Sequence, residues 1–161
     1  MLNKILITLG DDSDAAKILE HGLTVAAKFN AEVMLLHVLN PLQSHGFNVA
    51  DSPLLGGILP IVNDEAIKKY TEEWQIYEKK SMERLRSYQQ QAIDRGLKTQ
   101  ILQNFGDSAP MICAAAKEWL ADLIVIGRNQ KPDLSEIFLG STSSYVLHHA
   151  TCSVWIVQLL S

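Results

Sequence analysis

Five short runs of apolar residues alternate along the chain with longer segments in which apolar residues recur at helical spacing. The runs cover residues 4–9, 31–39, 97–105, 122–127 and 152–157. Four of them are apolar almost throughout, as in strands buried on both faces, and residues 97–105 alternate in part. The pattern therefore predicts five strands.

Amphipathic helices are predicted between these strands. Residues 13–29 carry small and apolar side chains on one stripe, and so does a long segment that begins at Asp64 and ends at Gly96, a good C-cap residue. Residues 106–121 place a proline in the first helical turn, which is a helix-start signature. Residues 143–149 predict a short last helix.

Residues 40–63 interrupt this alternation. They contain three prolines and the pair Gly56-Gly57, which together exclude a regular helix. Connections of this length are uncommon and are usually either functional or unstructured. We expect the apolar second half to pack onto the domain, and we treat the segment as a candidate lid over a ligand.

The order of elements predicts a single α/β domain over residues 1–161. Strands that alternate with helices form a parallel sheet with helices on both faces, joined by right-handed crossovers. Ligands of such sheets bind beyond the carboxyl ends of the strands, where the strand order reverses. Residues that follow directly after a strand are therefore the first candidates for a site.

Composition narrows the class of protein. A net charge of −4 and an isoelectric point near 5.7 give no basic footprint for DNA or RNA. No apolar run reaches the ~20 residues that span a membrane, and residues 1–12 lack the features of a signal peptide. Cys113 and Cys152 form neither a disulfide framework nor a zinc site. We expect a reduced, cytoplasmic protein that binds neither nucleic acid nor membranes.

Two strand ends have residues suited to a ligand. The first strand runs into Gly10-Asp11-Asp12-Ser13, and the fourth into Gly127-Arg128-Asn129-Gln130-Lys131 ahead of a helix that begins near Gly140-Ser141. Glycines let the backbone approach a phosphate, and a helix N-terminus offers N–H groups and the positive end of its dipole. A carboxylate after the first strand would accept hydrogen bonds from a ribose. The same residues fit ordinary capping and strand-ending roles equally well, and the chain has no P-loop and no G-x-G-x-x-G after the first strand.

The chain resembles the universal stress proteins of the UspA type over essentially its full length. Nucleotide-binding members carry G-x2-G-x9-G-[ST] between the fourth strand and the last helix, and here Gly127 and Gly140-Ser141 match its first and last elements. The segments KILITL and AEVMLLHV are similar to the first two strands of the family. GDSAPMICAAAKEWLADLIVIG and LGSTSSYVLHHATCSVWIVQ are similar to its third helix with the fourth strand and to its C-terminal part.

This resemblance implies a Rossmann-like open sheet of strand order 3-2-1-4-5, with ATP or AMP bound across strands one and four, with or without Mg²⁺. It also implies a homodimer through the last strand, around Ser153 to Gln158, with Trp155 near the interface or, equally, in the core. The backbone of Val38 would face the adenine. The implied nucleotide-binding set comprises Leu9, Gly10, Asp11, Asp12, Val38, Ile126, Gly127, Arg128, Gln130, Lys131, Gly140, Ser141, Thr142 and Ser143.

Two positions depart from the family's pattern. The middle glycine of the motif is Gln130, whose side chain would crowd a ligand or strain the turn. Gly10 occupies the place of the family's ribose-binding aspartate when the loop is aligned without gaps. A one-residue slip of the loop would restore the carboxylate through Asp11.

Other residues that draw attention have structural interpretations. We expect one of His148 and His149 to be packed and the other exposed, because neighbours on a helix point in different directions. His37 lies at the ligand edge, and we expect it to have a hydrogen-bonded structural role. The two cysteines are expected to pack in the core, and Trp74 with the tyrosine stripe of the long helix is expected to pack on the sheet.

Three functions fit the sequence. The first, which we favour, is a dimeric, adenine-nucleotide-binding regulator or sensor in the stress response. The second is a dimeric interaction module that has lost the nucleotide, which Gln130 and Gly10 would permit. The third is a slow ATP hydrolase, for which the sequence offers no convincing general base and no carboxylate pair other than Asp11 and Asp12.

Overall fold

The computed structural model describes residues 1–11, 13–40, 64–128 and 140–158. Strands and helices alternate along this part of the chain as the sequence predicts, with boundaries within a few residues of those expected. The elements are β1 (Lys4–Thr8), α1 (Ala15–Phe29), β2 (Glu32–Leu39), α2 (Asp64–Asp94), β3 (Thr99–Phe105), α3 (Ser108–Trp119), β4 (Leu123–Arg128), α4 (Ser141–His149) and β5 (Ser153–Gln158). The expectations for the long connection fall on residues 41–63, outside the described residues.

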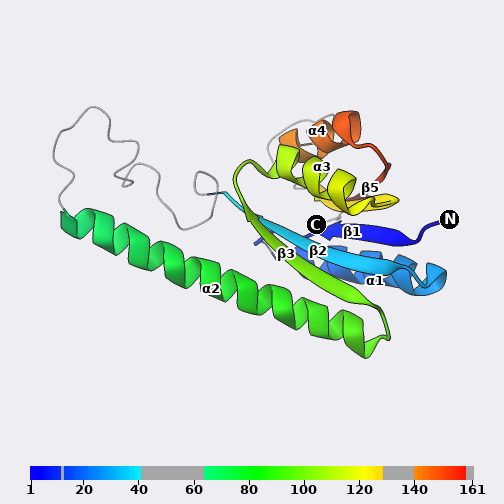
Figure 1. The fold of residues 1–161 in the computed structure, drawn as a ribbon, viewed down its shortest axis with the longest axis horizontal. Coiled ribbons are helices and arrows are strands. Elements are labelled where there is room, and N and C mark those ends of the chain that lie inside the picture. The colour runs from blue at the N-terminus through cyan, green and yellow to red at the C-terminus, as the bar shows by residue number, and fades with distance from the viewer. Residues whose placement is uncertain (12, 41–63, 129–139, 159–161) are drawn as a thin grey trace.

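The five strands form one parallel sheet in the order β3-β2-β1-β4-β5, which confirms the predicted topology. The strand order reverses between the central strand, β1, and its neighbour β4. Figure 1 shows α1 and α2 on one face of the sheet and α3 and α4 on the other. A helix that joins two parallel strands runs back along them, so α4 begins at the carboxyl edge of the sheet.

The core consists of two layers separated by the sheet. On one face, Ile5 and Ile7 of β1 pack with α1 and with Leu85 of α2. On the other face, Leu6 packs with the layer of α3 and α4. These three β1 side chains are fully buried. The apolar run of the first strand is therefore buried on both faces, because each face of the sheet is covered by helices.

The long helix α2 extends beyond the sheet at its N-terminal end (Figure 1). Its C-terminal half covers β2 and β3, where Leu85 and Ala92 are buried. None of the helices in the described ranges is both long enough and apolar enough to cross a membrane.

Helix α1 lies unusually close to the sheet at Gly22. A Cβ atom placed on this glycine would come within 2.4 Å of Cδ1 and 2.8 Å of Cγ1 of Ile7. Real Cβ contacts are longer than this, so a side chain here would force Ile7 or the helix to move. The missing side chain therefore sets the distance between α1 and the central strand.

Gly22→Val should lower the free energy of unfolding by about 1–3 kcal/mol, because overpacking displaces Ile7 from a close-packed core. Ala27→Val is the matched control, since Ala27 lies on the exposed side of the same helix and a valine there changes only helix propensity. Urea unfolding of both variants measures the difference. An equal loss of stability in the two variants would contradict the close approach of α1 at Gly22.

Candidate functional site

The start of α4 provides a cradle of backbone groups at the carboxyl edge of the sheet. Gly140 caps the helix with φ 77° and ψ 145°, a conformation that residues other than glycine rarely adopt. Ser141 is exposed at the first turn, and Ser143 is buried and donates through Oγ to the carbonyl of Gly140 at 3.3 Å. The N–H groups of a first helical turn are the kind of donors that bind phosphates in other proteins, so the start of α4 is a candidate anion site.

The end of β4 lies beside β1 and carries two of the predicted residues. A Cβ on Gly127 would come within 2.2 Å of Cδ1 of Ile18, so this glycine lets α1 pack against β4. Packing therefore gives Gly127 a structural role in addition to any contact with a ligand. Arg128 is half-buried, and its Nε atom has no hydrogen-bond partner within the described part of the chain.

The end of β1 is held from the opposite side, by β2 and α2. The Asp11 carboxylate accepts hydrogen bonds from the Tyr77 hydroxyl and the Arg84 guanidinium. Arg84 also donates through Nη1 to the Asp11 carbonyl at 3.3 Å. The Nε2 atom of His37 lies 3.4 Å from Oδ1 of Asp11. We call these residues, together with Ser81, the Asp11 cluster.

His37 joins the Asp11 cluster to the middle of α2. Its Nδ1 atom lies 2.6 Å from Oγ of Ser81, and both side chains are buried. A carboxylate is only an acceptor, so the Nε2 that faces Asp11 carries a proton. This confirms the expectation that His37 has a hydrogen-bonded structural role.

The environment of Asp11 stabilises its charged form. Burial raises the pKa of this carboxyl, but hydrogen bonds from His37 and Tyr77 and the positive charges nearby outweigh burial and lower the pKa from 3.8 to about 2. Burial and the hydrogen bond to Asp11 raise the pKa of the Tyr77 hydroxyl. Tyr77 therefore remains a protonated donor and Asp11 a charged acceptor over the whole physiological range.

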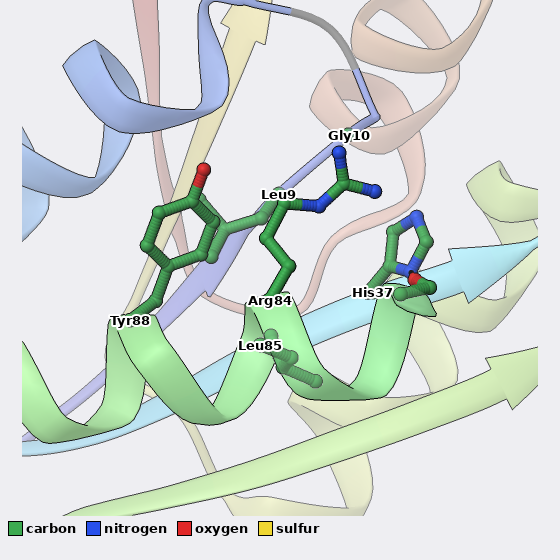
Figure 2. A pocket seen from close by; sticks show the side chains of 7 residues that line it. Leu9, Gly10, His37, Arg84, Leu85 and Tyr88 are labelled. Carbon is green, nitrogen blue, oxygen red and sulfur yellow. Dashed lines mark hydrogen bonds between the residues drawn. The ribbon is translucent and has the colours of Figure 1, made fainter. Parts of the chain in front are cut away.

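Figure 2 shows how the side chains of α2 reach the end of β1. The Arg84 guanidinium extends from the helix toward Gly10, and His37 approaches from the neighbouring strand. A cavity of about 10 Å³ lies between them, lined by Leu9, Gly10, His37, Ser81, Arg84, Leu85 and Tyr88. This volume accommodates about one water molecule and no larger ligand.

The order Ser81, His37 and Asp11 resembles the triad of a serine hydrolase, but the geometry does not suit a nucleophile. The Ser81 side chain is 2% exposed, so a substrate carbonyl cannot reach its oxygen. Ser81 also lies in the middle of α2, where backbone N–H groups are engaged in helical hydrogen bonds and cannot form an oxyanion hole. The arrangement connects α2 to the sheet.

The predicted binding residues divide into those at the surface of the edge and those in the core. Leu9 and Ile126 are only 4% exposed and belong to the two core layers. Val38 is half-buried against the layer of α3 and α4, and Thr142 is half-buried at the start of α4. Asp12, Gln130 and Lys131 lie outside the described residues.

The sequence interpretation missed three residues of the Asp11 cluster. Tyr77, Ser81 and Arg84 are spaced by four and three positions, which places them on one face of α2. The available signal was Ser81, a polar residue on a stripe that is otherwise aromatic and apolar. A buried polar side chain needs a partner, and here that partner comes from β2.

One smaller expectation is wrong and one, on the two cysteines, is confirmed. Both His148 and His149 are exposed, and the His149 ring stacks on Tyr145 at the surface of α4 with ring centroids 3.9 Å apart. Cys113 and Cys152 are half-buried against the layer of α3 and α4, as expected. Across the ranges that the structure describes, no three His, Cys, Asp or Glu side chains gather as potential metal ligands.

The sequence profile of the Universal stress protein family matches residues 1–158. The chain belongs to the universal stress protein family. The Universal stress protein Sll1388 of Synechocystis sp. is 34% identical to it over 155 residues, which are 96% of this chain and 97% of the relative. The profile match and the identity to this relative agree with the resemblance seen in the sequence motifs.

Solved structures of the family have the same fold at low sequence identity. A universal stress protein in complex with cAMP superimposes with a TM-score of 0.64, at 16% identity, over 98% of this chain and 97% of that one. A universal stress protein family protein of Arabidopsis thaliana with AMP bound superimposes with a TM-score of 0.61, at 15% identity, over 99% and 93% of the two chains. These likenesses establish the fold of this family member.

Asp11→Asn should lower the free energy of unfolding at pH 7 by about 2 kcal/mol, because the folded pKa of this carboxyl lies below the unfolded value of 3.8. The stabilisation by the charged Asp11 is complete above pH 3.8 and is lost as the pH falls through about 2. The free energy of unfolding of the variant should therefore fall less steeply than that of wild type between pH 3.8 and pH 2. Urea unfolding between pH 7 and pH 2 measures both effects. Asp94→Asn is the control, since Asp94 is exposed at the end of α2. Equal acid sensitivity of wild type and Asp11→Asn would contradict the claim that the Asp11 cluster stabilises the charged carboxylate.

Proposed function

We propose that this universal stress protein binds an adenine nucleotide, ATP or AMP, across the ends of β1 and β4, and that it acts as a dimeric regulator in the stress response. The observation that carries the proposal is the backbone of Gly140, which turns with positive φ into the N-terminus of α4 at the carboxyl edge of the sheet. That edge adjoins the reversal of strand order between β1 and β4.

The donors at this edge fit a nucleotide. The first turn of α4 supplies N–H groups and the hydroxyls of Ser141 and Thr142 for the phosphates. The Nε of Arg128, which has no partner among the described residues, is a further donor for an anion at the end of the adjacent strand. Asp11 is an ionised acceptor at the end of β1, suited to a ribose hydroxyl. The structural neighbours with AMP and with cAMP support an adenine nucleotide as the ligand class.

A dimeric module without nucleotide is the second candidate, and one observation favours it. The Asp11 carboxylate already has protein partners on both oxygens, from Tyr77 on one and from Arg84 and His37 on the other. A ligand would have to use the acceptor capacity that these partners leave. The comparisons give no support to the predicted Mg²⁺, which stays a prediction of the sequence.

The dimer is proposed to form through β5, an edge strand of the sheet. An edge strand presents unpaired N–H and C=O groups, and pairing with a second copy satisfies them. Trp155 on this strand is half-buried and packs against the core, with its ring 5.8 Å from the ring of His21. The core role of Trp155 is therefore present already in the single chain, and a role at the interface is part of the proposal.

Isothermal titration of the nucleotide-free protein with ATP and with AMP tests the proposal. We expect saturable binding near one site per chain, weakened at least tenfold in Gly140→Ala, because a Cβ both strains the turn and narrows the phosphate cradle. Gly96→Ala is the matched control: Gly96 has the same φ of 77° at the end of α2, with open space around it. The control should lose about 1–2 kcal/mol of folding stability and keep its affinity. A flat trace for both nucleotides with wild-type protein would favour the module without ligand.

Sedimentation equilibrium tests the dimer independently of the ligand. We expect a mass of about twice the 17.9 kDa of the chain. Val154→Pro removes one N–H from the edge strand and should shift the equilibrium toward monomer, whereas Val25→Ala on α1 should not, although both positions are half-buried. A single-chain mass for the wild type at micromolar concentration would contradict the proposed assembly.

A further inference from the structure

The acceptor capacity of Asp11 limits what it can offer a ligand. A carboxylate has about four lone-pair positions, two on each oxygen. On Oδ1, Arg84 and the N–H of His37 occupy both. On Oδ2, the Tyr77 hydroxyl occupies one. Counting partners from the described residues, one acceptor position on Oδ2 remains, and the side chain keeps 22% of its surface exposed.

The partners that fill the other three positions are fixed by the fold. His37 is held on β2 by its bond to Ser81, and both are buried. Arg84 is tied to the backbone of Asp11 as well as to its side chain. Tyr77 packs its ring against Trp74, with centroids 5.6 Å apart, so its hydroxyl is directed by the aromatic contact as well as by the hydrogen bond. A weak ligand hydroxyl would not displace a set of donors positioned in this way.

A ribose presents two neighbouring hydroxyls, and a carboxylate with two free acceptor positions, on one oxygen or on both, accepts a hydrogen bond from each. We propose that Asp11 of this chain accepts from only one of the two ribose hydroxyls, and that Tyr77 is the specificity-determining residue that imposes this limit. The inference rests on the proposed nucleotide function, because it assigns the ribose to Asp11. If Asp11 accepts from one hydroxyl only, the site tolerates the loss of one of the two ribose hydroxyls, 2′ or 3′, and loses affinity when the other is missing.

Titration of the protein with ATP, 2′-deoxy-ATP and 3′-deoxy-ATP tests the inference. In wild type, one deoxy analogue should bind within about twofold of ATP and the other about tenfold or more weakly, because one hydroxyl donates to a charged acceptor and the other does not. Tyr77→Phe keeps the ring and its contact with Trp74 but removes the donor to Oδ2. In this variant both deoxy analogues should bind about tenfold or more weakly than ATP.

Tyr88→Phe is the matched control. Tyr88 lies three turns further along the same helix, packs against the core and makes no contact with the Asp11 carboxylate. Its loss of a hydroxyl should leave the order of the three affinities as in wild type. Thermal unfolding of both variants shows that any change in discrimination does not come from loss of the fold.

Each other outcome overturns the inference in a distinguishable way. If wild type loses affinity for both deoxy analogues, the ribose uses both oxygens of Asp11, or groups other than Asp11, and Tyr77 imposes no limit. If it loses affinity for neither, the ribose does not donate to Asp11, although nucleotide binding stands. If Tyr77→Phe discriminates as wild type does, Tyr77 is not the limiting residue. If no adenine nucleotide binds to wild type, the proposed function itself is wrong and the inference falls with it.

Discussion

The charge on Asp11 is the interaction on which this edge of the domain depends. Once α2 covers the end of β1, the carboxylate is half-buried and would be unfavourable without compensation. The chain compensates it with donors from two elements, His37 from β2 and Tyr77 and Arg84 from α2. One ion therefore fixes the loop after the central strand, the register of the long helix and the orientation of a buried histidine.

This arrangement divides the carboxyl edge of the sheet into two halves. The half made by β4 and α4 carries the backbone of Gly140 and Ser141 at the start of a helix, which suits an anion. In the half made by β1, β2 and α2, side chains leave a cavity for about one water molecule. In the proposed complex, a nucleotide would place its phosphates against β4 and α4 and its sugar against β1, β2 and α2. In the proposed complex, recognition of the sugar would therefore depend on the packing of α2.

Glycines at the same edge have different physical reasons, although a motif treats them alike. Gly140 has a positive φ and a side chain there would be strained in any surroundings. At Gly127, the structure gives a packing reason, because Ile18 of α1 fills the space of a side chain. Matching the spacing of a glycine motif therefore does not distinguish contact with a ligand from contact between a helix and the sheet.

The sequence by itself determined the elements, the parallel sheet and the glycine-led start of α4, because these follow from periodicity and from backbone restrictions local to a few residues. It also identified Asp11 and His37 as residues of the ligand edge. It did not identify Tyr77, Ser81 and Arg84 as their partners, since these lie more than forty residues from His37 or Asp11 and ordinary helical spacing explains each of them. Only the tertiary structure decided that α2 packs across β2 with this face toward β1. A buried carboxylate takes its partners from whichever elements the fold brings within hydrogen-bonding distance, and that distance is not encoded at any single position.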